Sequence, residues 1–374
     1  MESTTGLDLA RSARAITANP PFTVGTLRKA IPAHCFDRSL AWSLFYLLAD
    51  ISCIVSLGCG SQLIDHPSVP RVVAWTLLWP LYWFLQGAVA TGVWVIAHEC
   101  GHQAFSKWQS VNDGVGLVLH SALLVPYFSW KHSHRRHHSN TGNVQKDEVF
   151  VPKHKGKPQE DGPSEWQDIP LVKLSNLVNM LLFGWPLYLL ANVSGREYEG
   201  HASHFDPYSP IFSKRERSEI VASDAVLGLV LYGLYTLGSS IGWAWFCKVY
   251  LAPYLMVNGW LVMITLLQHT HPALPHYHEA TWDWLRGALA TCDRSYGFLD
   301  HFHHHIADTH VLHHLFSTIP HYHAQEATAA IKPILGDYYN YDSRNVFVAM
   351  WQDYPQCVYV APDSEGEEAL WYRK

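Results

Sequence analysis

The chain alternates between long apolar runs and polar, histidine-rich segments. A helix needs about 20 apolar residues to cross about 30 Å of hydrocarbon. Four runs meet this length, and they lie near residues 41–63, 72–97, 225–247 and 249–267. Two other apolar stretches fit a spanning helix less well, because residues 115–128 are too few and residues 174–193 carry three asparagines. We therefore predict an α-helical integral membrane protein with about four transmembrane helices, in which residues 115–128 form a re-entrant or interfacial segment.

Histidines gather in three short clusters outside the apolar runs. Residues i, i+3 and i+4 share one face of a helix, and this spacing occurs in His134-Arg135-Arg136-His137-His138 and again in His310-Val311-Leu312-His313-His314. A looser cluster, His98-Glu99-Cys100-Gly101-His102, follows the second run. Imidazole is the commonest protein metal ligand, and eight histidines exceed the four ligands of a zinc site. The pattern indicates two metal ions with the ligands His98, His102, His134, His137, His138, His310, His313 and His314.

A ninth ligand follows from the membrane topology. Ligands on opposite sides of a bilayer cannot meet, so the chain must cross it an even number of times between His138 and His310. A tight hairpin of the runs 225–247 and 249–267, with little more than Lys248 between them, satisfies this condition and leaves residues 174–193 as the non-spanning run. The hairpin then returns to the histidine clusters at Gln268-His269-Thr270-His271. We expect His269 to be the ninth ligand, with His271 as the alternative.

The distribution of positive charge predicts the orientation of the protein in the membrane. The segment from Trp130 to Lys173 carries eight lysines and arginines, including Lys155 and Lys157, and such loops stay in the cytosol. The histidine clusters would then belong to a cytosolic cap. We expect a cytosolic N-terminal segment at 1–40, a membrane domain at 41–330 and a cytosolic tail at 331–374. A net charge of −6 gives no basic surface for nucleic acid, and the seven cysteines, which form no C-x-x-C pair, are expected to be reduced.

Iron explains this ligand set better than zinc. Histidine-rich iron with open coordination positions activates O₂, whereas zinc has no redox chemistry and would leave the doubled site unexplained. Carboxylates commonly orient metal-bound imidazoles, and the candidates for this role are Glu99, Asp147, Asp300 and Asp308. Asp50 lies inside the first apolar run, where a carboxylate is either a functional group or a polar contact between helices.

Two other function classes compete with an oxygen-activating enzyme. The first cluster also fits H-E-x-x-H, in which two histidines hold zinc and the glutamate acts as general base. Such a membrane zinc protease uses only His98 and His102 and leaves six clustered histidines idle. A metal transporter should place its ionisable ligands near the bilayer midplane. Here the histidines cluster at helix ends and in loops, which argues against transport.

Longer stretches around the clusters carry a resemblance to a known family. The segments W-V-I-A-H-E-C-G-H-Q-A-F-S, H-R-R-H-H-S-N-T-G and T-H-V-L-H-H-L-F-S-T-I-P-H-Y-H closely resemble the membrane fatty acyl desaturases, and within them the oleate Δ12 desaturases of fungi and plants. The resemblance extends from about residue 20 to the C-terminus. It implies a helical stem with a cytosolic cap that holds two irons, in the endoplasmic reticulum membrane. The eight clustered histidines match the family's histidine boxes, and His269 matches a further ligand.

The resemblance also implies the reaction and its partners. A family member uses O₂ and two electrons from cytochrome b5, supplied by an NADH-dependent reductase, to remove hydrogens from adjacent methylenes of a lipid-linked acyl chain. No H-P-G-G haem-binding motif occurs here, so cytochrome b5 is expected as a separate protein. Leu312 stands where Ala is expected and His132 where Tyr is usual. Because both adjoin the boxes, a related acetylenase or hydroxylase acting on an acyl chain or a specialised metabolite is the alternative outcome.

Overall fold

The computed structural model describes residues 6–11, 14–154 and 169–374, and most of these residues are helical. Lys155 and Lys157, which contributed to the predicted orientation, lie outside the described residues. Within the described part of the chain, five helical segments are long and apolar enough to cross a membrane. They are α2 (Leu40–Ser61), α3 to α4 (Arg71–Val73 and Trp79–Gly101, joined by the π-helical turn η2, Ala74–Leu78), α7 (Pro170–Ala191), α8 (Arg217–Ile241) and α9 to α10 (Trp243–Phe246 and Ala252–His269, joined by the π-helical turn η4, Cys247–Leu251).

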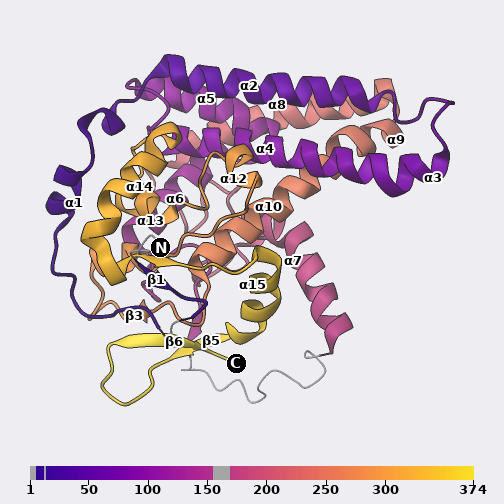
Figure 1. The fold of residues 1–374 in the computed structure, drawn as a ribbon. Helices are drawn as coiled ribbons and strands as arrows, with labels where there is room; N and C mark the ends of the chain where they lie inside the picture. The colour runs from indigo at the N-terminus through magenta and orange to yellow at the C-terminus, as the bar shows by residue number, and fades with distance from the viewer. Residues whose placement is uncertain (1–5, 12–13, 155–168) are drawn as a thin grey trace.

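Four of these segments coincide with the four predicted spans, and α7 is the fifth. By length and composition α7 also qualifies, and the idea that it stays out of the bilayer remains a prediction. Buried residues of α7 and α10 belong to one apolar core, which includes Leu177, Trp260 and Leu267. In Figure 1, α2, α4 and α8 run across the upper part of the molecule, while α7 lies apart from them beside α10.

The hairpin between α8 and α9 turns at Gly242 rather than at the predicted Lys248. Gly242 has φ +88°, a conformation that glycine adopts without a Cβ clash. Lys248 lies inside the following helical segment, where its ammonium group pairs with Asp65 and sits 4.6 Å from the centre of the Trp79 ring. A lysine that is neutralised by a carboxylate and covered by an indole does not need to end an apolar helix. The sequence pattern alone does not show this pairing.

Residues 115–128 are part of two helices that meet at a sharp bend. Helix α5 (Gln109–Ala122) and helix α6 (Tyr127–Asn140) are inclined by 107° to each other. This geometry suits either a broken span or a re-entrant loop, so the re-entrant or interfacial assignment stays a prediction. The bend brings α6 back toward the end of α4, and it thereby places the second histidine box beside the first.

The remaining elements pack on one side of the long helices. The short helices are α1 (Val24–Ala30), η1 (Ala33–Phe36), α11 (Trp284–Ala288), α12 (Leu299–Phe302), α13 (His310–Leu315), α14 (His321–Leu335), η5 (Gly336–Tyr338), α15 (Val346–Asp353) and η6 (Tyr354–Gln356). The strands are β1 (Leu7–Asp8), β2 (Lys153–His154), β3 (His276–Tyr277), β4 (Asn340–Tyr341), β5 (Tyr359–Ala361) and β6 (Ala369–Arg373). Figure 1 shows this part below α2 and α4, with β5 and β6 at the far end from α2.

Two small sheets tie the chain ends to this part of the molecule. Strands β1 and β4 pair in parallel, with Leu7 opposite Asn340. The other sheet has the order β2-β5-β6-β3, in which β6 is antiparallel to both neighbours. The expected tail at 331–374 is therefore integrated into the fold, since β6 pairs with β3 at His276 and Tyr277.

A candidate metal centre beside an apolar cavity

The predicted histidines come together from four helices. The C-terminal end of α4 supplies the first box, α6 supplies the second and α13 the third. The last residue of α10 is His269. The i, i+3, i+4 spacing of the second and third boxes is realised on helices, as expected. The structure thus brings nine predicted residues to one place.

Five of the nine imidazoles form one group. The group consists of His98, His102, His134, His138 and His313, and one ligand nitrogen from each lies within 4.8 Å of all the others. The Nε2 atom of His134 lies 2.9 Å from Nε2 of His98 and 3.2 Å from Nε2 of His138. So many ring nitrogens pointing at a common centre suit a single cation.

The other four imidazoles form a second group next to the first. His137, His269 and His314 meet within 4.8 Å, and Nε2 of His310 lies 2.9 Å from Nε2 of His269. The rings of His138 and His314 stack at 4.1 Å with only 10° between their planes, and these two residues belong to different groups. The arrangement therefore offers two adjacent sites with five and four imidazoles.

Burial and missing hydrogen bonds both fit metal binding. Three Nε2 atoms, those of His102, His313 and His314, are buried without a hydrogen-bond partner, which is costly unless something else binds them. Burial lowers the pKa of His102 and of His310 to about 3. Both rings are therefore neutral near pH 7 and can use a nitrogen lone pair to bind a metal. The clusters are chemically compatible with metal ions.

His269, and not His271, lies in the cluster. The Nε2 atom of His269 is 3.3 Å from Nε2 of His137, whereas Nε2 of His271 accepts from Arg344 at 2.9 Å. His271 sits near Asp342 and Asp353, and two arginines neutralise these carboxylates. A metal ion would gain little binding energy here, because two guanidinium groups already balance the negative charge of these carboxylates. His269 therefore lies among the clustered histidines, whereas His271 lies in a separate ionic network.

Only one of the four candidate carboxylates contacts a clustered histidine. Oδ1 of Asp147 lies 2.6 Å from Nδ1 of His137, the position for a group that orients a metal-bound imidazole. Asp308 pairs instead with His305, at 3.0 Å. Asp300 accepts from the Ser295 hydroxyl at 2.6 Å and from a backbone N–H. The prediction for Asp300 and Asp308 is wrong because both carboxylates are held by residues outside the histidine cluster.

The contacts of Glu99 do not match the role expected of the general base of a protease. Its Oε1 accepts from the backbone N–H of His321 at 2.6 Å, at the first residue of α14. A side-chain oxygen at a helix N-terminus satisfies a free backbone N–H. Glu99 therefore fastens α14 to α4, and it does not orient a clustered imidazole as the sequence suggested.

Asp50 and His132 make structural contacts near the centre. Oδ2 of Asp50 lies 2.7 Å from Nε2 of His304, so the buried carboxylate of α2 joins the loop that precedes α13. His132 lies 2.6 Å from Oε2 of Glu219 and links α6 to α8. Asp50 was considered either as a functional group or as a polar contact between helices, and the structure supports a polar contact between structural elements.

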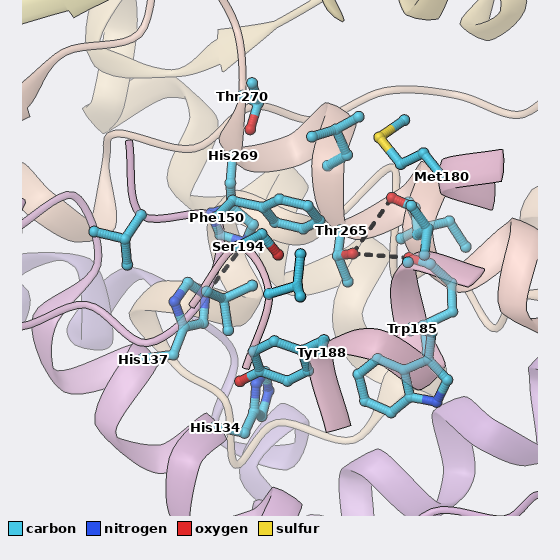
Figure 2. Close-up of a pocket in the computed structure, with 18 of the residues that line it drawn as sticks. His134, His137, Phe150, Met180, Trp185, Tyr188, Ser194, Thr265, His269 and Thr270 are labelled. Atoms are coloured by element: carbon cyan, nitrogen blue, oxygen red, sulfur yellow. Dashed lines mark hydrogen bonds between the residues drawn. The ribbon is translucent and has the colours of Figure 1, made fainter. Parts of the chain in front are cut away.

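An apolar cavity of about 430 Å³ opens onto the histidines, within the range of about 300–1,000 Å³ that small-molecule pockets occupy. His98, His134, His137, His269 and His310 all contribute to its lining. Figure 2 shows His134, His137 and His269 on one side of the cavity and Met180 and Trp185 of α7 on the other. An apolar chain in this cavity would lie directly against both groups of imidazoles.

Much of the cavity wall was not predicted. Met180, Gly184, Trp185 and Tyr188 of α7 line it, together with residues distant in sequence. Those distant residues are Phe150, Tyr354, Cys357 and Tyr372. No motif marks these positions, and the apolar character of α7 is the only signal in the sequence. Their role depends on packing between segments that are far apart along the chain.

The fold and the site define a helical membrane protein in which a histidine cluster compatible with metal binding lies beside an apolar cavity. Residues 74–345 match the fatty acid desaturase family. The chain belongs to this family, which confirms both the resemblance and the helical membrane class of the fold.

Several relatives are similar over nearly the whole chain. The Delta(12)-acyl-lipid-desaturase of Punica granatum is 55% identical over 96% of this chain and 93% of its own length. The Delta(12)-oleate desaturase of Trichosanthes kirilowii is 54% identical over 96% of both chains. The Omega-6 fatty acid desaturase, endoplasmic reticulum isozyme 1, of Glycine max is 54% identical over 96% of this chain and 92% of its own length.

Proposed function

We propose that this enzyme introduces the Δ12 double bond into a lipid-linked oleoyl chain, using O₂ and two irons held by nine histidines. The observation that carries the proposal is the cavity that runs between α7 and the two imidazole groups. The names of the relatives, a Delta(12)-acyl-lipid-desaturase and a Delta(12)-oleate desaturase among them, support the position of the double bond. The zinc protease has no support, because Glu99 is committed to α14.

The irons supply O₂ activation when bound. His98, His102, His134, His138 and His313 would hold one iron, and His137, His269, His310 and His314 the other. Overall, a CH₂–CH₂ unit, one O₂, two electrons and two protons become CH=CH and two waters. Asp147 orients His137 through its Nδ1 atom. The apolar residues of α7 and α10, such as Trp185 and Leu261, exclude water and hold the acyl chain extended beside the centre.

The reaction consumes two electrons, which a donor protein would supply. We propose cytochrome b5 with its NADH-dependent reductase as separate donor proteins. The endoplasmic reticulum membrane is the proposed location, supported by the name of the Glycine max relative. The histidine boxes would face the cytosol, where cytochrome b5 can approach them.

Expression in a yeast that lacks polyunsaturated lipids tests the proposal. Mass spectrometry should detect an 18-carbon acyl chain with a second double bond at position 12, and the purified protein should contain two irons per chain. Detection of a triple bond, a hydroxylated product or a double bond at another position would contradict Δ12 desaturation and show that the same fold catalyses a different oxidation. About one zinc and no iron per chain would contradict the di-iron assignment.

A further inference from the structure

A second cluster of metal-ligand side chains lies outside the histidine boxes. The side chains of His34, Cys35, His323 and Glu326 bring four ligand atoms within 4.8 Å of one another. His34 and Cys35 belong to η1, and the other two belong to the first turns of α14. His323 and Glu326 are three residues apart, so they share one face of that helix. We propose that this cluster binds one zinc ion.

The ligand types favour zinc. A thiolate, two imidazoles and a carboxylate are all established zinc ligands, and four of them complete a tetrahedral site. Ligand atoms about 2.0–2.3 Å from a tetrahedral ion lie about 3.3–3.8 Å apart. Nε2 of His34 is 3.7 Å from Sγ of Cys35 and 2.9 Å from Oε2 of Glu326. The His34–Cys35 distance already falls in this range, and the half-exposed side chains of His34 and Glu326 can adjust to bring the other ligand atoms to the ion.

The charges also match. A zinc ion would displace the proton of the Cys35 thiol to solvent, and its two positive charges would balance the thiolate and the Glu326 carboxylate.

The cluster has an entry path and a structural consequence. Cys35 is fully buried, whereas the side chains of His34 and Glu326 are 54% and 51% exposed. An ion can therefore arrive from solvent and meet the sulfur at the bottom of the site. Cys35 shares an apolar core with Leu312 of α13. A zinc ion at this position would fasten the N-terminal segment to the helix that follows the third histidine box.

Cobalt provides a specific probe, because a thiolate–cobalt bond gives an ultraviolet charge-transfer band. None of the nine clustered histidines supplies sulfur, so binding of Co²⁺ in the iron centre would not produce this band. The iron-loaded full chain in detergent should develop the band with one equivalent of Co²⁺, and Zn²⁺ should abolish it. Cys35→Ser should lose the band, whereas Cys59→Ser, which alters an exposed cysteine of α2, should keep it.

Two further variants keep the test decisive if Cys35→Ser does not fold. His323→Gln and Glu326→Gln change side chains at the edge of the core, and iron content and desaturase activity would report that the fold is retained. Loss of a group that merely supports a ligand costs about 10–100-fold in affinity, so loss of a ligand should cost at least about 100-fold in Co²⁺ affinity. Absence of the band in the unmodified chain, its persistence in Cys35→Ser, or unchanged affinity in both other variants would overturn the proposal.

Discussion

Asp147 and His137 form a carboxylate–imidazole contact at the proposed iron centre that follows the pattern of known metal sites, with 2.6 Å between Oδ1 and Nδ1. Asp147 also accepts from the backbone N–H groups of Gly142 and Glu148, at 3.0 and 2.7 Å. These bonds fix the carboxylate, and the carboxylate in turn fixes the imidazole. The residues after α6 are therefore part of the support of the second imidazole group.

Asp147→Asn should lower iron content and desaturase activity about 10–100-fold, because an amide orients the imidazole less well and removes a negative charge. Asp308→Asn is the matched control, since Asp308 pairs with His305 and contacts none of the nine clustered histidines. Iron analysis and product analysis on both variants check the prediction. Equal effects of the two changes would show that the Asp147 contact has no special role.

The His269→Ala and His271→Ala pair tests the ninth ligand. Removing His269 should abolish product formation and lower the iron content, because the ligands act as one unit. Removing His271 should leave iron in place and reduce thermal stability, since Arg344 loses an acceptor in a buried ionic network. Iron loss in the His271 variant with full iron in the His269 variant would reverse the assignment. The eight boxed histidines should behave like His269.

Glu99→Gln separates desaturation from proteolysis. Glutamine can still accept the hydrogen bond from the His321 N–H, so we expect product formation to remain within about tenfold and stability to change by no more than about 1 kcal/mol. If Glu99 were instead a general base of the catalysed reaction, its loss would lower the rate of that reaction about 10²–10⁴-fold. Double-bond formation and thermal melting are the measurements. A loss above 10²-fold at full iron content would contradict the structural role.

Gly184→Leu should narrow the cavity opposite the histidines. A Cβ atom at this position meets Val262 and Met180 at ordinary contact distances, so the rest of the new side chain extends into the space for the substrate. Loss of the space for one methylene group in such a pocket lowers kcat/KM about 10–200-fold. Turnover of an oleoyl chain should fall, shorter chains should be less affected, and iron should stay. Gly228→Leu on α8, where a Cβ has open space, is the control.

Leu312→Ala tests whether this departure from the family pattern matters for the product. The sequence led us to expect an influence on product outcome. Leu312 is buried in a core with Leu27 and Ile331, while other residues line the cavity. The expected result is therefore a loss of stability of about 2–5 kcal/mol at unchanged iron and unchanged product ratio. Changed product ratios at full iron would restore the first interpretation.

Local patterns predicted the parts of the centre that depend on local geometry. The spacing of His134, His137 and His138 specifies one helical face whatever surrounds it. His269 could be found because apolar runs and an even number of crossings return the chain to the boxes. Lys248 and Asp300 were misjudged because their partners, Asp65 and Ser295, had to be known first. The same reason explains why Tyr188 and Tyr372 were missed in the cavity wall.

Neighbouring residues on α6 and on α13 face different imidazole groups. His137 and His138 divide between the two, and so do His313 and His314. Adjacent residues on a helix are rotated by about 100°. An insertion or deletion of a single residue within either helix would therefore misdirect ligands of both groups at once. The spacing of the histidines along these two helical segments therefore cannot change without loss of both groups.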